Sequence, residues 1–154
     1  MYLLDTNHCS LAIQGQPDIL SRLNTIGDFR IATCVIVQAE LIYMAENSQR
    51  REANRHRIEE FLANIFIYGI DAATATIYGQ FQAELMQRFG PKDKAKRRRT
   101  HTSDIGFSQH DLWIAAIAVQ HDLTVVSTDR DFQRMQEVRA LSLESWYVPE
   151  SRSR

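Results

Sequence analysis

The sequence predicts an α/β fold: a three-layer α/β/α sandwich with a central, mainly parallel sheet. Short apolar segments alternate along the chain with longer segments of helical periodicity, a pattern typical of parallel strands joined by helices. The 154 residues are 44% hydrophobic and 24% charged, an ordinary balance for a globular chain. A chain of this length can bury its own core, so one domain is expected.

Five segments have the character of short strands. Each is an apolar run of a few residues, and the run at 65–70 is also rich in Ile, Phe and Tyr, which favour strands. The expected strands are 2–4, 30–33, 65–70, 124–126 and 139–143.

The segments between these strands carry helix start and stop signals. Asp71 and Ser108 are expected to cap helices, as is Thr33, and Gly90-Pro91 ends the helix before it. The expected helices run from Pro17 to about Gly27, over 35–47, 50–64, 72–89 and 109–120, and from the residues after Asp129 to Met135. The stretch at 91–102 is expected to be a polar, basic insertion.

Neither the cysteines nor the N-terminus indicates an exported or membrane protein. Cys9 and Cys34 lack the spacing of a metal site or redox motif, and the five histidines show no zinc-ligand spacing. There is no signal-peptide pattern, and the longest apolar stretches are far shorter than a membrane span. A reduced cytosolic protein is expected, with one domain over 1–148 and a disordered tail at 149–154.

Basic residues gather in two places although the formal net charge is only −1. The segment Lys92–Arg99 holds six basic residues and one acidic residue, a local charge of +5, and Arg50–Arg57 has a local charge of +3. Such clusters indicate a surface that contacts phosphates. The alternative is a solvated loop and a solvated helix face.

Four acidic residues stand where an ordinary surface charge is not expected. Asp5 and Asp129 follow two of the expected strands, and ligands bind parallel sheets at the carboxyl ends of strands. Glu40 and Asp111 lie in helices that are apolar nearly all round, where a carboxylate needs a partner. The structural alternatives are caps for Asp5 and Asp129, an arginine partner for Glu40 and a helix-dipole contact for Asp111.

Carboxylates brought together in this way repel one another, and a divalent cation relieves the repulsion. An all-oxygen set of ligands suits Mg²⁺ or Mn²⁺.

The acidic residues belong to motifs that occur in a characteristic order. These are Asp5-Thr6-Asn7, Ala39-Glu40-Leu41, Ile105-Gly106, His110-Asp111-Leu112-Trp113-Ile114-Ala115-Ala116 and Val126-Ser127-Thr128-Asp129-Arg130-Asp131-Phe132. In this order and spacing they resemble the PIN domain, in its VapC toxin branch, over residues 1 to about 145. The resemblance implies a metal-dependent endoribonuclease that cleaves single-stranded RNA with a metal-activated water.

The resemblance also implies roles for individual residues and partners. Asp5, Glu40, Asp111 and Asp129 would be the catalytic and metal-binding acids. Thr6, Asn7, Ser127 and Asp131 would support them. A VapB-like antitoxin would block the acidic groove with a segment that carries an arginine, and the toxin would form a homodimer. Phe81, Trp146 and Tyr147 are candidates for exposed aromatics in that contact.

The chain departs from the family pattern in two places. His110 stands where asparagine is common, and the basic insertion precedes the last acidic helix. We interpret the insertion as an arm whose Lys92, Lys94, Lys96, Arg97, Arg98 and Arg99 bind RNA phosphates.

Two other functions are compatible with parts of this pattern. A non-catalytic RNA-binding PIN module would keep the fold and the basic arm, and the metal dependence of any nuclease activity distinguishes it from an enzyme. A Mg²⁺-dependent phosphoacceptor or phosphatase also uses aspartates at strand ends. Its patterns need a lysine at a later strand end, whereas all lysines here lie at 92–96.

Overall fold

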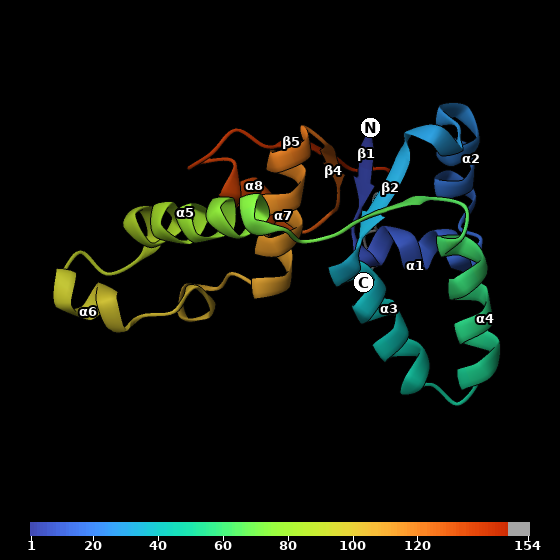
Figure 1. Ribbon diagram of the computed structural model, residues 1–154, viewed down its shortest axis with the longest axis horizontal. Helices are drawn as coiled ribbons and strands as arrows, with labels where there is room; N and C mark the ends of the chain where they lie inside the picture. The colour runs from blue at the N-terminus through green and yellow to red at the C-terminus, as the bar shows by residue number, and fades with distance from the viewer. Residues whose placement is uncertain (148–154) are drawn as a thin grey trace, which may run out of the picture.

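A computed structural model gives the fold of the chain, and it describes residues 1–147. Within these residues the sheet has five strands, all parallel, in the order β3-β2-β1-β4-β5 (Figure 1). The strands are β1 (Tyr2–Leu4), β2 (Ile31–Cys34), β3 (Phe66–Tyr68), β4 (Thr124–Val126) and β5 (Ser142–Glu144). The predicted parallel sheet is therefore confirmed, with the last strand displaced towards the C-terminus.

Eight α-helices, counted within residues 1–147, cover the two faces of the sheet. They are α1 (Thr6–Gln14), α2 (Pro17–Ile26), α3 (Val35–Glu46), α4 (Arg51–Leu62), α5 (Ala72–Phe89), α6 (Lys94–Arg99), α7 (Gln109–His121) and α8 (Arg130–Met135). Helices α1 to α4 lie together on one side, and α5, α7 and α8 lie on the other (Figure 1). This is the predicted three-layer sandwich.

The strand order contains a switch point beside β1. The chain adds β2 and β3 on one side of β1 and then returns to add β4 and β5 on the other. Right-handed crossovers that proceed in opposite directions place their helices on opposite faces of the sheet. Ligands bind at such a point, outside the carboxyl ends of the strands. Here those ends are Leu4 of β1 and Val126 of β4, which are register partners.

The core forms between the central strands and α7. Leu3, Leu4, Val125 and Val126 are fully buried, and α7 buries residues on every side, as its apolar sequence predicts. Helix α3 is also apolar nearly all round, and its sequence predicts burial on every side, but the structure buries it on one side only. Its outer side leaves Tyr43 71% exposed and Met44 48% exposed.

The structure corrects three further details of the prediction. Cys34, not Thr33, is the N-cap of α3, because the Thr33 hydroxyl donates to the Leu4 carbonyl of the neighbouring strand (2.9 Å). Phe81 is fully buried and unavailable for an interface, while Trp146 packs edge-on against Tyr2. The basic insertion contains helix α6, which Asp93 caps through the amide of Lys96 (2.8 Å).

The turn from α5 to α6 depends on the absence of a side chain at Gly90. A Cβ there would lie 2.4 Å from the carbonyl oxygen of Met86 and 2.5 Å from its sulfur. The Gly90 amide also closes the last turn of α5 on that same carbonyl (2.9 Å). A methyl group at this position would therefore force the end of α5 or the turn at Gly90 to shift.

We predict that Gly90→Ala lowers the free energy of unfolding by about 1–3 kcal/mol, the usual cost of overpacking. Gly79→Ala on the same helix is the matched control, because a Cβ at Gly79 meets nothing within 4 Å. Replacing glycine by alanine inside an open helix stabilises it by roughly 0.5–1 kcal/mol. Urea unfolding of the two variants measures the difference, and equal effects would contradict the steric argument.

Candidate metal centre

The acidic residues come from four segments that meet at the switch point. Asp5 follows β1 and caps α1, and Asp129 follows β4 and caps α8. Asp111 lies in the first turn of α7, after the cap Ser108, and Glu40 lies in the middle of α3. The capping roles that the sequence offered as alternatives for Asp5 and Asp129 are therefore real, and they coexist with a place in the acidic site.

The tightest group of carboxylates is Asp111, Asp129 and Asp131. One oxygen from each lies within 4.8 Å of the others. The start of α8 brings two of them together, because the amide of Asp131 donates to Asp129 Oδ1 (2.8 Å). Sequence reasoning gave Asp131 only a supporting role, yet the geometry places it in the central group.

Burial and the neighbouring carboxylates raise the pKa of Asp111. Its pKa is raised from 3.8 to about 7, first by burial and then by the negative charges of four other carboxylates. In decreasing order of effect these are Asp129, Glu40, Asp131 and Asp5. All the acids named from the sequence therefore lie close enough to act on Asp111 electrostatically.

Asp5 is held by the first turn of its own helix. Its Oδ1 accepts the His8 amide (2.7 Å) and lies 2.9 Å from His8 Nδ1. Asp5 is 5% exposed, and the His8 imidazole is fully buried beneath it. Sequence reasoning assigns no role to His8, although its position three residues after a capping aspartate indicates this contact.

Glu40 is held from two sides by Thr6 and His110 rather than by an arginine. The Thr6 hydroxyl donates to Oε2, and His110 Nδ1 lies 2.7 Å from Oε1. The contact to Thr6 fits the supporting role implied for it. The contact to His110 links α3 to the start of α7, so it joins two of the segments that carry acids.

The other supporting residues differ in their contacts. Ser127 is buried, and its hydroxyl accepts the amide of Asp129 (3.0 Å), which fixes the turn after β4. Asn7 is exposed, and its side chain forms no hydrogen bond with any residue of 1–147.

Arg134 connects the central group to the loop before α7. Its Nη1 lies 3.3 Å from Asp131 Oδ1, and its Nη2 donates to the Ile105 carbonyl (3.1 Å). The guanidinium carbon lies 4.0 Å from the centre of the Phe107 ring and 4.8 Å from that of Phe89. The sequence analysis did not identify Arg134, although its spacing of three residues from Asp131 on a helix allows an ion pair.

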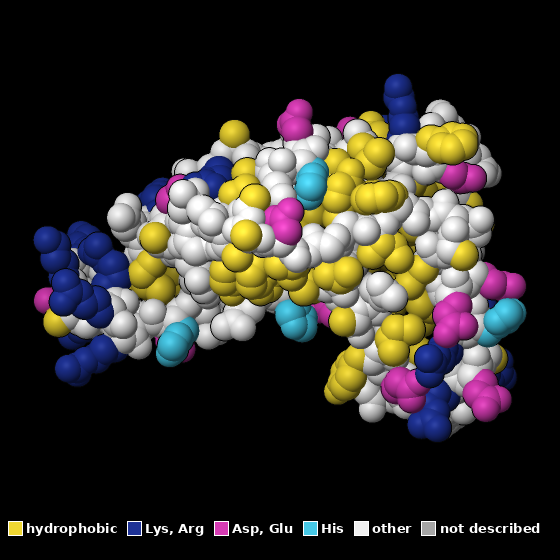
Figure 2. Space-filling view, in the orientation of Figure 1, with side chains coloured by type: hydrophobic (Ala, Val, Ile, Leu, Met, Phe, Trp, Pro, Cys, Tyr) yellow, Lys and Arg dark blue, Asp and Glu magenta, His cyan; other side chains and the backbone are white. Residues whose placement is uncertain are grey.

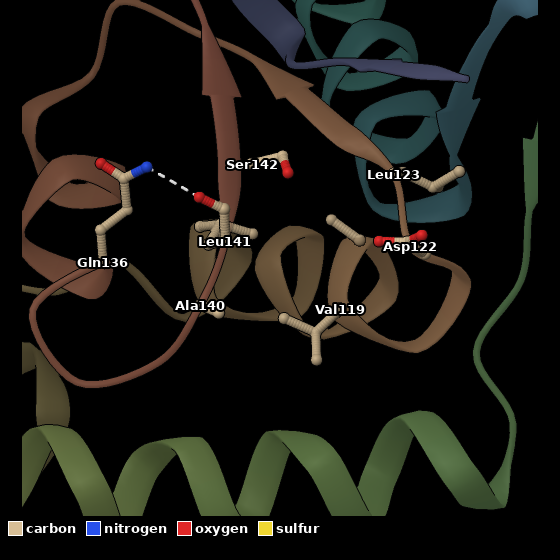
Figure 3. A pocket seen from close by; sticks show the side chains of 8 residues that line it. Val119, Asp122, Leu123, Gln136, Ala140, Leu141 and Ser142 are labelled. Carbon is tan, nitrogen blue, oxygen red and sulfur yellow. Dashed lines mark hydrogen bonds between the residues drawn. The ribbon is translucent and has the colours of Figure 1, made fainter.

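A cavity of about 400 Å³ at the other end of the sheet does not belong to this site (Figure 3). It lies beside the beginnings of β4 and β5 and contains one acid, Asp122, at the end of α7. Gln136 closes one wall by donating to the Leu141 carbonyl (2.7 Å). The acidic site lies at the opposite, carboxyl edge.

The two basic clusters have different electrostatic surroundings. Arg51 and Arg55 of α4 form ion pairs with Glu46 (3.4 Å each), and Arg55 also pairs with Glu59 (3.0 Å). None of the six basic residues at 92–99 forms an ion pair with any part of 1–147. Figure 2 shows cationic side chains gathered over α6, whereas over α4 they are mixed with acidic ones.

The thiols are structural, as predicted. Cys9 and Cys34 are both buried, and burial raises the pKa of Cys34 to about 11. Neither is an activated nucleophile.

Comparisons with known proteins agree with this fold. The PIN domain profile matches residues 2–138. The chain is 30% identical to ribonuclease VapC2 of Rickettsia felis, over 95% of this chain and 98% of the relative. It is 31% identical to the tRNA(fMet)-specific endonuclease VapC of Shigella flexneri, over 94% and 97%. The VapBC2 complex of Rickettsia felis bound to a promoter DNA fragment superposes with a TM-score of 0.76 at 30% identity, covering 95% and 98%.

The fold and its acidic edge thus define a PIN domain. The chain belongs to the PIN-domain family, and within it to the VapC proteins. Within 1–147, no helix combines the length and apolar character that crossing a membrane requires.

The raised pKa of Asp111 has a consequence for stability. Between about pH 4 and 7 the folded chain keeps a proton on Asp111 that the unfolded chain has released. In the presence of a chelator, the contribution of Asp111 to the free energy of unfolding therefore falls as the pH rises through this window. We predict that Asp111→Asn loses this part of the pH dependence.

Urea unfolding from pH 4.5 to 8 (roughly the window between the two pKa values, with a margin) would measure the effect in both proteins. Asp18→Asn is the control, because Asp18 is an exposed acid on α2, outside the cluster. Parallel pH profiles for the parent protein and Asp111→Asn would show that Asp111 titrates normally.

Proposed function

We propose that this chain is a divalent-metal-dependent endoribonuclease, the toxin of a VapBC-type toxin–antitoxin system. The observation that carries the proposal is the acidic group at the switch point of a PIN domain, with Asp111, Asp129 and Asp131 within 4.8 Å. The relatives named ribonuclease or endonuclease VapC support the reaction class, and their chains align over almost their full length.

The donor set fits Mg²⁺ or Mn²⁺. Its atoms are carboxylate oxygens, and within residues 1–147 the single cation paired with the central group is Arg134, on one oxygen of Asp131. Burial and then the charges of the neighbouring carboxylates raise the pKa of Asp111, and a divalent ion would relieve the part that is due to repulsion. Asp111, Asp129 and Asp131 would hold the ion, with Asp5 and Glu40 completing the acidic surroundings. When bound, such an ion makes water acidic enough to supply hydroxide near neutral pH.

The residues around the acids have the task of fixing their geometry. His8 and the first turn of α1 orient Asp5, while Thr6 and His110 orient Glu40. Asp111 must release its proton before it can bind a cation, so cation affinity rises with pH up to about 7. The carboxylates also repel phosphate, so the substrate needs positive charge elsewhere.

Basic residues of the insertion would supply that charge. Their side chains form no ion pair with acidic residues of 1–147. Most of them lie on α6, which begins shortly after the tight turn at Gly90. The surface is hollowed between α6 on one side and α3 and α4 on the other, and α7 begins towards this hollow (Figures 1 and 2). RNA would lie along it. The phosphate-binding residues would be Lys92, Lys94, Lys96, Arg97, Arg98 and Arg99.

An antitoxin and a second copy of the chain are the proposed protein partners. Solved structures of VapBC complexes from Rickettsia felis and Salmonella typhimurium match this chain at TM-scores of 0.76 and 0.75. The exposed apolar side of α3, with Tyr43 and Met44, is available for such a contact. A cytosolic location remains a prediction from the sequence.

A non-catalytic RNA-binding module is the competing proposal. All the acids are present, and Asp129, Glu40, Asp131 and Asp5 lie close enough to Asp111 to raise its pKa in addition to the effect of burial. Carboxylates gathered in this way favour a metal-binding enzyme over a module that needs only the basic arm.

We predict that Asp111→Asn, Asp129→Asn and Asp131→Asn each lower RNA cleavage at least about 100-fold, because loss of an outer-shell partner alone costs 10–100-fold. Removing the metal with EDTA should abolish cleavage by the parent protein, and Mg²⁺ or Mn²⁺ should restore it. The measurement is single-turnover cleavage of an RNA with single-stranded loops, with Asp18→Asn as the control.

Two outcomes would contradict the proposal. Cleavage that persists in EDTA would exclude metal-dependent hydrolysis. Full activity of Asp131→Asn alongside inactive Asp111→Asn would return Asp131 to the supporting role that the sequence suggested.

A further inference from the structure

Helices α5 and α6 line an open surface cavity of about 410 Å³ that lies apart from the acidic site. Its lining residues are Ala83, Met86, Gln87, Lys94, Arg97 and Arg98. Helix α5 contributes Ala83, Met86 and Gln87, of which only Gln87 is polar. Helix α6 contributes three cationic side chains. The cavity thus has an apolar wall facing a basic wall.

The tight turn and the cap fix the distance between these walls. Gly90 approaches Met86 so closely that no other residue fits without a shift, and Asp93 caps α6. The cavity is therefore formed by the fold of the hairpin before any ligand arrives, which lowers the entropic cost of binding.

Arg97 presents a guanidinium that the backbone already holds. Its Nε donates to the Pro91 carbonyl (2.9 Å) and its Nη2 to the Lys92 carbonyl (3.0 Å). Two fixed bonds in the plane of the group leave its flat faces for stacking, and unpaired RNA bases stack on arginine planes. Lys94 and Arg98 form no ion pair within 1–147, so both are available for a phosphate.

We propose that this cavity binds one unpaired nucleotide of the RNA substrate, outside the cleavage centre. The base lies between the apolar side of α5 and the Arg97 guanidinium, and the adjoining phosphate lies near Lys94 and Arg98. Gln87 offers the base edge a donor and an acceptor. The inference rests on the proposed ribonuclease function, and it adds base stacking at a defined place to the phosphate contacts of the arm.

The charge pattern favours a nucleotide over an acidic peptide. A carboxylate would need only a cation, and α6 also has exposed cations outside the cavity, Lys96 and Arg99. The nucleotide also uses the apolar wall and the fixed guanidinium. The chain runs from α6 through the loop before α7 into the helix that carries Asp111. An RNA strand bound at the cavity is therefore bound by the same segment of the chain that leads to the acidic site.

Filling the cavity without changing its charge tests the proposal. The variant is Ala83→Leu, at an exposed position on α5, and the matched control is Ala75→Leu, an exposed alanine of the same helix outside the cavity. Both are made in full-length Asp111→Asn protein, so that the RNA stays intact. Binding is followed by fluorescence anisotropy of an end-labelled, unstructured RNA of about ten nucleotides, within the span that one such groove occupies.

We expect Ala83→Leu to weaken binding at least about fivefold, the lower end of what one stacked base contributes. The dependence of affinity on salt should not change, because no cation is lost. Lys94→Gln with Arg98→Gln should instead flatten that dependence, by about 0.7 in the logarithmic slope for each lost phosphate contact. Ala75→Leu should bind as the parent does.

Other results overturn the proposal in distinguishable ways. Suppose that Ala83→Leu binds RNA as the parent does, while the double variant has a flatter salt dependence. The basic residues would then contact phosphates, but the cavity would bind no base. Weaker binding of an acidic peptide but not of RNA by Ala83→Leu would make the cavity a protein contact. RNA that neither binds the Asp111→Asn protein nor is cleaved by the parent would refute the proposed function along with the cavity.

Discussion

The mutual repulsion of carboxylates at one edge of the sheet is the constraint on which the rest of this structure depends. Acids from the end of β1, from α3 and α7 and from the turn after β4 converge there, and burial together with their charges raises the pKa of Asp111 to about 7. Only a rigid scaffold keeps such groups together. The parallel sheet supplies it, because β1 and β4 end at the same level and lie beside a buried α7.

Each carboxylate is also restrained locally, and the restraint differs with its surroundings. Buried Asp5 has the His8 amide and imidazole, and the more exposed Glu40 has Thr6 and His110. Hydrogen bonds to charged oxygens are stronger than neutral ones, and they fix orientation as well as position. The acids are therefore arranged in advance for a cation that prefers oxygen ligands in a narrow geometry.

Much of the site could be predicted because it follows from where strands end. Asp5 and Asp129 follow apolar runs, and Asp111 stands at the start of an apolar helix, so each is visible in the sequence. The place of Asp131 depends on the direction in which α8 leaves its cap, which no local pattern specifies. The contact of His110 with Glu40 spans 70 positions. The sequence did not indicate helix α6 because a run of cations resembles a solvated loop, and it did not indicate that Arg51 and Arg55 of α4 pair with Glu46 of α3 and with Glu59.

The separation of charge between α6 and the acidic edge follows from the same constraint. A site that gathers carboxylates repels a polyanionic substrate, and a cation bound there neutralises only part of the charge. Positive side chains close to the acids would pair with them, as Arg134 pairs with Asp131, and would then attract no phosphate. Unpaired cations therefore have to stand away from the acids, yet on the same side of the molecule. A short helix at the end of α5 meets both conditions, and with a net charge of −1 for the whole chain, only such segregation gives the protein a positive surface for RNA.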